Sequence, residues 1–138
     1  MRWYHLLISL LLLSICIIFY LSWIPEPQLG KVWFIPSFIA RWADEKNNDS
    51  IRTAVPFVFL GILTGIYLAY RKGHWYGWLV SAVVLITIAC IAEAGQFFLP
   101  HRSFDVADIL WGSAGGIAGE LLIAVVWLAA RRIKSPSR

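Results

Sequence analysis

Four apolar runs, each long enough to cross a lipid bilayer, set the strongest limit on what this chain can fold into. A helix rises about 1.5 Å per residue, so about 20 residues cross a hydrocarbon core of about 30 Å. The hydrophobic share of 59% exceeds the roughly 45–50% of ordinary soluble domains. We therefore expect an all-α fold with a single domain over residues 1–138, an integral membrane bundle of four transmembrane helices at about residues 6–24, 54–70, 78–99 and 109–130.

The first apolar run admits two interpretations. Arg2 gives it the positive flank of a secretory signal peptide. However, the run is long, and no small-x-small cleavage motif follows it before Pro25. We therefore expect a retained membrane anchor.

The connection between the first two runs contains a short amphipathic segment at residues 33–43. Its apolar residues recur at helical spacing, and Pro36 suits a first helical turn. The segment predicts a short helix lying in the membrane interface, with its tryptophans at the depth of the headgroups. A helix packed on the mouth of the bundle explains the same pattern equally well.

Basic residues are distributed unequally between the two ends of the expected bundle. The end that holds both termini carries seven of them and the other end five, four of which lie in a loop that also contains acids. The positive-inside rule then favours a multi-pass protein of the cell membrane with both termini in the cytoplasm. The basic residues form short flanks, without the basic and aromatic surface that binds nucleic acid.

Cysteine and histidine spacing does not indicate a metal site. Cys16 and Cys90 fall inside apolar runs, where cysteine behaves as a small apolar residue. The three histidines are scattered and lack the paired spacing of zinc ligands. We expect no metal, no cofactor and no disulfide framework.

Glu93 is the most informative polar residue because it lies inside the third apolar run, seven residues before Pro100. Placing an ionisable group at the bilayer centre costs about 2.5–3.5 kcal/mol, so such residues usually face a cavity or a partner. Gln96 shares its helix face. A functional cavity is the favoured interpretation, and a hydrogen bond that joins two helices is the alternative.

Arg102, Asp105 and Asp108 follow in the turn before the fourth run. One interpretation is structural, with Asp105 as the helix N-cap, Asp108 in the first turn and Arg102 as their counter-ion. The other is a polar pocket in which Arg102 holds an anionic group while the acids orient it. The candidate ligand-binding cluster is therefore Glu93, Gln96, Arg102, Asp105 and Asp108.

Small residues predict close helix packing. Gly61 and Gly65 allow close approach in the second run, and Gly112, Gly115 and Gly119 lie near the Asp108 face of the fourth. We expect this glycine face of the fourth run to approach the third run closely and to bring Asp108 toward Glu93. The role of Glu120, deeper in the fourth run, does not follow from the sequence.

This cluster resembles the signature of the VanZ-like family, which reads Glu-x-x-Gln, a Pro and an Arg, Asp-x-x-Asp, then Asn-x-x-Gly-x-x-x-Gly. The chain departs from it at Gly112, where the family usually has asparagine. The resemblance implies a small membrane protein associated with lowered susceptibility to teicoplanin-type lipoglycopeptides, or with envelope and polysaccharide work. The matching residues are Glu93, Gln96, Pro100, Arg102, Asp105, Asp108, Gly115 and Gly119.

Three functional hypotheses stay open, all with the lipid bilayer as a partner. In the first, the outward-facing cluster binds an envelope component or a glycopeptide. In the second, an enzyme acts on a lipid-linked or phosphate-bearing envelope substrate, with Glu93 or Asp108 as general base and Arg102 stabilising negative charge. In the third, the protein is a structural subunit. No catalytic residue is identified, because His101 and Ser103 are the only nearby pair of base and nucleophile and residues two apart do not face each other on a helix.

Overall fold

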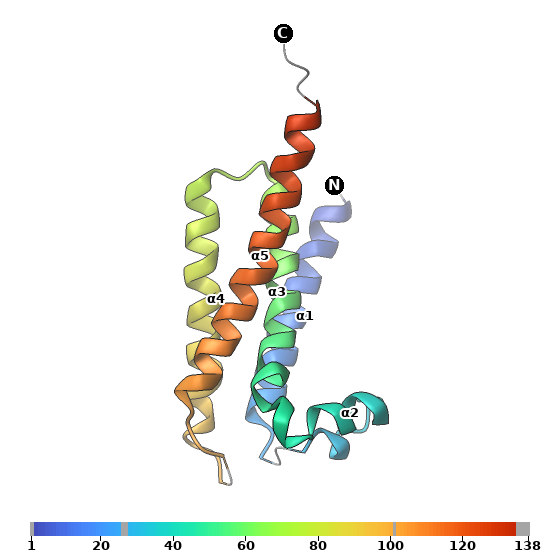
Figure 1. Ribbon diagram of the computed structural model, residues 1–138, viewed down its shortest axis with the longest axis vertical. Coiled ribbons are helices and arrows are strands. Elements are labelled where there is room, and N and C mark those ends of the chain that lie inside the picture. The colour runs from blue at the N-terminus through green and yellow to red at the C-terminus, as the bar shows by residue number, and fades with distance from the viewer. Residues whose placement is uncertain (1, 26–27, 101, 135–138) are drawn as a thin grey trace.

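The computed structural model describes residues 2–25, 28–100 and 102–134. This part of the chain folds into helices and contains no strand, which confirms the all-α prediction. Four long helices run along the molecule, and short helical segments connect the first two of them (Figure 1). The elements are α1 (Arg2–Trp23), η1 (Leu29–Lys31), α2 (Ser37–Ala43), η2 (Lys46–Asn48), α3 (Asp49–Tyr70), α4 (Trp75–Gln96) and α5 (Val106–Lys134).

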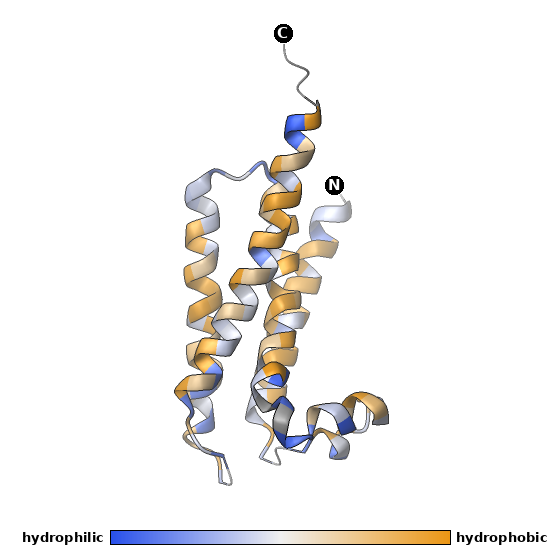
Figure 2. Ribbon diagram, viewed as in Figure 1, coloured by the Kyte–Doolittle hydropathy of each residue, from blue (hydrophilic) through white to orange (hydrophobic). Residues whose placement is uncertain are grey.

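All four long helices are long and apolar enough to cross a membrane. Their middles are hydrophobic, and hydrophilic residues gather at the two ends of the bundle (Figure 2). Large apolar side chains remain exposed on the outside, among them Leu12 at 60% and Val125 at 64% of their surface. Side chains of this kind are stable against lipid rather than water, so the bundle fits contact with a bilayer.

The helices begin and end at different residues from the apolar runs. α3 begins at Asp49, five residues before the predicted start at residue 54, and α4 covers Trp75–Gln96 rather than 78–99. α3 begins early because its backbone hydrogen bonds continue through residues with polar side chains. As a consequence, Arg52 and Thr53 lie on α3 instead of in the preceding loop. At the end of α4, the N–H groups of residues 97–99 bond three residues back instead of four, so the α-helix ends before the apolar run does.

The helix in the long connection is shorter than the predicted segment at 33–43. It covers Ser37–Ala43, with Pro36 as its N-cap residue. Proline disfavours a helical conformation in the residue before it, so Ile35 cannot join the helix. α2 extends sideways from the bundle, at the end where the turn between α4 and α5 also lies (Figure 1).

Glycines bring α3 and α5 together, and here the expected packing is wrong for two of the three glycines of the fourth run. A side chain at Gly115 would meet the carbonyl oxygen of Ala54 at 2.5 Å, and one at Gly119 would meet the carbonyl of Val58. Both partners belong to α3, so Gly115 and Gly119 pack against the second membrane helix rather than the third, whereas Gly112 lies between α3 and α4. Gly61 of α3 completes the contact.

A small apolar core lies between the four helices, toward the end that carries α2. Leu60 of α3 and Leu85 of α4 are its most deeply buried side chains, and Ile18 of α1 joins them. The remaining buried members come from α3 and α4 and are Phe57, Ile88, Ala89 and Ala92. The core fixes the positions of α1, α3 and α4, whose ends form the site described next.

Candidate functional site

Glu93 is buried at the end of α4 and connects two parts of the chain. Its side chain is 3% exposed. Oε1 accepts a hydrogen bond from the backbone N–H of Asp105 at 2.6 Å, and Oε2 accepts one from Nε2 of Gln96 at 3.1 Å. Hydrogen bonds to a carboxylate are stronger than neutral ones. Glu93 therefore holds the segment that leads into α5 against the end of α4.

Asp105 has the structural role that its position suggested. Its Oδ1 accepts a hydrogen bond from the backbone N–H of Ala107 at 2.8 Å. This is the geometry of an N-cap, which satisfies one of the free N–H groups at the start of a helix. Asp105 thus begins α5 with its side chain and binds Glu93 with its backbone.

One interpretation made Arg102 the counter-ion of Asp105 and Asp108, and of these two acids only Asp108 acts on its guanidinium in the structure. The Nε of Arg102 donates to the carbonyl of Ile24 at 3.2 Å, and its Nη2 donates to the carbonyl of Leu21 at 3.4 Å. These carbonyls lie at the C-terminal end of α1, where a cation also meets the negative end of the helix dipole. Arg102 therefore joins the turn after α4 to α1.

Neighbouring charges act on the pKa of Arg102 in opposite directions. Burial lowers the pKa of its guanidinium, and the positive charge of Arg52 lowers it further. The negative charges of Asp108 and Glu93 act in the opposite direction. Arginine has a very high ordinary pKa, so the group stays charged. The two arginines and two acids thus form one electrostatic cluster.

Asp108, on α5, connects this cluster to α3. Its Oδ1 accepts a hydrogen bond from Oγ1 of Thr53 at 3.0 Å. The first turn of α5 is therefore attached to the first turns of α3. Asp108 is partly buried, and in the first turn its charge also meets the positive end of the helix dipole.

Arg52 and Asp44 attach the α2 segment to the bundle. Nη1 of Arg52 donates to the carbonyl of Ala43 at 3.4 Å and lies 4.0 Å from Oδ1 of Asp44. The Asp44 carboxylate accepts backbone N–H bonds from Leu29 at 2.7 Å and Gly30 at 2.9 Å. This arrangement fixes the connection between α1 and α3 as a wall beside the polar cluster.

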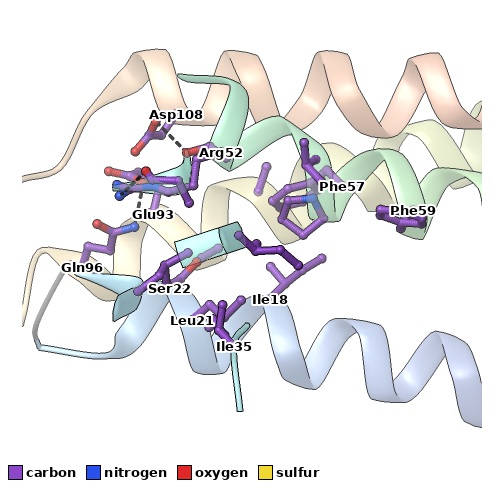
Figure 3. Close-up of a pocket in the computed structure, with 18 of the residues that line it drawn as sticks. Ile18, Leu21, Ser22, Ile35, Arg52, Phe57, Phe59, Glu93, Gln96 and Asp108 are labelled. Atoms are coloured by element: carbon purple, nitrogen blue, oxygen red, sulfur yellow. Dashed lines mark hydrogen bonds between the residues drawn. The ribbon is translucent and has the colours of Figure 1, made fainter. Parts of the chain in front are cut away.

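A cavity of about 380 Å³ opens between α1, α3, α4 and the α2 segment. Figure 3 shows that its lining is polar at one end, with Glu93, Gln96 and Asp108, and apolar toward Phe57 and Phe59. Its described lining residues are Ile18, Leu21, Ser22, Leu29, Phe34, Ile35, Pro36, Ile39, Trp42, Ala43, Arg52, Thr53, Val55, Pro56, Phe57, Phe59, Ala89, Ala92, Glu93, Gln96, Arg102 and Asp108. Most of the surface is thus apolar and the charges are confined to one end, as in sites for amphiphilic ligands.

The VanZ/LLP1 family model matches residues 6–128, which is most of the chain and includes every residue of this cluster. The chain belongs to the VanZ/LLP1 family. No curated protein and no solved structure compared with it gave a match. The match and the four apolar helices together describe a multi-pass membrane protein.

Four of the five predicted site residues of this VanZ/LLP1 protein border the cavity. They are Glu93, Gln96, Arg102 and Asp108. Asp105 is exposed and is not among the lining residues, because its side chain is turned toward the first N–H groups of α5. The cluster therefore divides into residues that border the cavity and one that builds the turn.

The sequence interpretation missed Arg52, Thr53 and Asp44 as parts of the site. A charged residue just before an apolar run is a weak signal, since it usually marks only the end of a membrane helix.

Gly112 stands where the VanZ-like family usually has asparagine, and the structure shows what surrounds this position. A side chain at Gly112 would meet the Phe57 ring at 3.1 Å and the Cβ of Ala89 at 3.4 Å, between two walls of the cavity.

Proposed function

We propose that this VanZ/LLP1 protein binds an amphiphilic envelope molecule at the outer face of the cell membrane and thereby lowers susceptibility to teicoplanin-type glycopeptides. The cavity with one polar and one apolar end is the observation that carries the proposal. An amphiphile matches both ends at once, with its polar group at Arg52, Arg102, Glu93 and Asp108 and its hydrocarbon chain near Phe57 and Phe59. Burying the chain supplies affinity, and the charged groups supply orientation.

The charges at the polar end support a ligand that carries both donors and acceptors. Two guanidinium groups and two carboxylates border the same end of the cavity. Guanidinium binds carboxylate or phosphate with paired hydrogen bonds, and carboxylates accept from hydroxyl, amide or ammonium groups. Teicoplanin and lipid-linked envelope precursors both combine a hydrocarbon chain with groups of these kinds, whereas vancomycin has no such chain.

The test measures teicoplanin and vancomycin susceptibility in a sensitive Gram-positive host that expresses the protein, together with surface-bound labelled teicoplanin. Wild type should protect against teicoplanin more than against vancomycin. Val55→Trp adds bulk to the cavity lining and should remove this selective protection. Phe98→Trp is the matched control, because Phe98 is 82% exposed at the same end of the bundle and is not a lining residue.

Arg102→Ala tests the polar end of the cavity in the same assay. It should also remove protection, provided that membrane levels equal those of wild type, because Arg102 additionally holds α1. A well-expressed wild type that gives no protection would refute the glycopeptide part of the proposal. Unchanged protection in both Val55→Trp and Arg102→Ala would refute the cavity as its site.

A second candidate function is an enzyme that acts on a lipid-linked phosphate. The observation that favours it is the presence of Asp108 and Arg102 at one end of the same cavity. Asp108 would act as general base and Arg102 would stabilise developing negative charge. Purified protein incubated with undecaprenyl-linked phosphates should then release product, and Asp108→Asn should abolish the release. Absence of turnover across these substrates would exclude this candidate.

A further inference from the structure

A second cavity, of about 550 Å³, lies at the other end of the bundle. It forms where the turn between α3 and α4 meets the last turns of α5. Its described lining residues are Lys72, Gly73, His74, Trp75, Trp78, Ala124, Trp127, Leu128 and Arg131. We call this the basic cavity, because Lys72 and Arg131 border it and none of its described lining residues is acidic.

The absence of acids at this end follows from the sequence. The last acidic residue of the chain is Glu120, and none occurs between Asp49 and Glu93. The turn after α3 and the end of α5 together contain Arg71, Lys72, Arg131 and Arg132 among their basic residues. Their positive charge is therefore not compensated by carboxylates of the same segments, and it attracts anions from outside the protein.

A backbone hydrogen bond fixes the chain at Lys72, and an aromatic contact holds the cationic group of Arg131 in place. Lys72 has a φ of 52° and ends α3, with its N–H bonded to the carbonyl of Ala69 at 3.1 Å. The Arg131 guanidinium lies 4.0 Å from the centre of the Trp127 ring, which in turn lies 6.0 Å from the Trp78 ring. A cation over an aromatic face is attracted by the negative charge of the ring face. Arg131 is thus positioned before any ligand arrives.

The start of α4 adds a third feature that favours anions. His74 is its N-cap residue and makes no side-chain cap hydrogen bond. The first N–H groups of a helix and the positive end of its dipole together attract phosphate. Trp75, which is 73% exposed, and Trp78 follow directly and border the cavity. Tryptophans in membrane helices concentrate at the depth of lipid headgroups.

We propose that the basic cavity binds the headgroup of an anionic phospholipid, with the phosphate between Lys72, Arg131 and the start of α4 and the acyl chains on the apolar surface beside Trp127 and Leu128. The bilayer brings this ligand to the correct depth. A zwitterionic lipid fits less well, because its ammonium or choline group would lie against the same cations. The proposal does not depend on the function of the first cavity.

The test uses native mass spectrometry of the purified full chain in detergent with added phosphatidylglycerol or phosphatidylcholine of identical acyl chains. Wild type should retain phosphatidylglycerol preferentially. The double variant Lys72→Gln/Arg131→Gln should lose about 30-fold in affinity for it. Arg71→Gln/Arg132→Gln is the matched control, since it removes the same charge at the same end from residues that do not line the cavity. It should lose much less.

Three outcomes would overturn the proposal. Equal losses in the two double variants would show diffuse attraction by the whole basic end instead of a site. Equal retention of both lipids by wild type would show that the headgroup charge is not recognised. Displacement of the lipid by soluble glycerol phosphate at similar concentration would assign the cavity to a free phosphate. Lys72→Arg/Arg131→Lys, which keeps both charges, should retain binding and serves as the folding control.

Discussion

Asp105 and Glu93 form one hydrogen-bonded unit that closes the turn between α4 and α5, and the two contacts of Asp105 can be separated by mutation. Asp105→Ala removes the cap on Ala107 and leaves the backbone bond to Glu93 in place. It should lower the free energy of unfolding by about 0.5–2 kcal/mol, whereas Asp105→Asn should cost little because asparagine is also a good N-cap. Thermal unfolding midpoints in detergent check the series. Equal destabilisation by alanine and asparagine would contradict the capping role.

Glu120 is a different kind of buried acid, because it has no visible structural purpose. Its side chain is 3% exposed, and neither carboxyl oxygen has a hydrogen-bond partner in the described part of the chain. Oγ of Ser81 on α4 is the polar atom that acts on Glu120, but it makes no hydrogen bond of acceptable geometry with it and has no other partner among the described residues. A buried polar group without a partner costs about 1–3 kcal/mol.

Glu120→Leu should therefore raise the free energy of unfolding by about that amount, because it removes the polar group and keeps most of its volume. Unfolding in a denaturing detergent such as sodium dodecyl sulfate, followed by circular dichroism, measures the change. Glu120→Gln is the control that keeps the shape and polarity and should gain little. A destabilised Glu120→Leu would mean that Glu120 has a partner outside these contacts.

Helix packing depends on a few glycines, so the same substitution should have opposite effects at two positions. A side chain at Gly61 would collide with the carbonyl oxygen of Gly116, a backbone atom that cannot move without displacing α5. One at Gly77 would meet only Cδ2 of Leu68, at an ordinary 3.5 Å. Gly61→Ala should destabilise the bundle by more than about 1 kcal/mol. Gly77→Ala should stabilise it slightly through helix propensity, by up to about 1 kcal/mol.

Thermal midpoints of the two variants and wild type, taken in one detergent, decide this prediction. Equal tolerance of both substitutions would show that α3 and α5 do not pack as closely as the structure indicates. Loss of stability in Gly77→Ala alone would point to a close contact at the turn between α3 and α4 instead.

Which helices exist could be predicted from the sequence, but which of them pack together could not. Length and apolarity identify membrane helices because lipid requires both. Each helix is apolar on nearly every side, so its periodicity does not show which face meets which neighbour. For that reason the Gly115 and Gly119 face was assigned to the third helix, although it packs on the second.

The candidate site shows the same limit. Glu93 could be identified because an acid inside an apolar run requires an explanation. The hydrogen bonds from Arg102 to the carbonyls of Leu21 and Ile24 could not be predicted, because they join residues about 80 positions apart and backbone carbonyls leave no signal in the sequence. Thr53 was missed because hydropathy placed it in the preceding loop, whereas the helix continues through it.

At the scale of the whole molecule, the two ends of the bundle have different chemistry. The end with α2 carries both acidic and basic residues. It contains the cavity of about 380 Å³ with one polar and one apolar end, which we call the amphipathic cavity. The other end holds the start of α1 and the end of α5 (Figure 1) and has an excess of basic residues. Such an asymmetry orients a membrane protein during insertion, because basic flanks remain in the cytoplasm. The proposed outer-face function requires that the amphipathic cavity open on the opposite side.

Single cysteines at the two ends test this orientation. Cys16 and Cys90 are replaced by alanine, and one new cysteine is placed at Ser103, beside the amphipathic cavity, or at His74, in the basic turn. Both positions are exposed. A membrane-impermeant maleimide should label Ser103→Cys in intact cells and His74→Cys only after permeabilisation, because the basic end stays inside. The reverse pattern would place the amphipathic cavity in the cytoplasm, where it could not meet an extracellular glycopeptide, and would leave only the lipid-linked substrates of the inner leaflet for it.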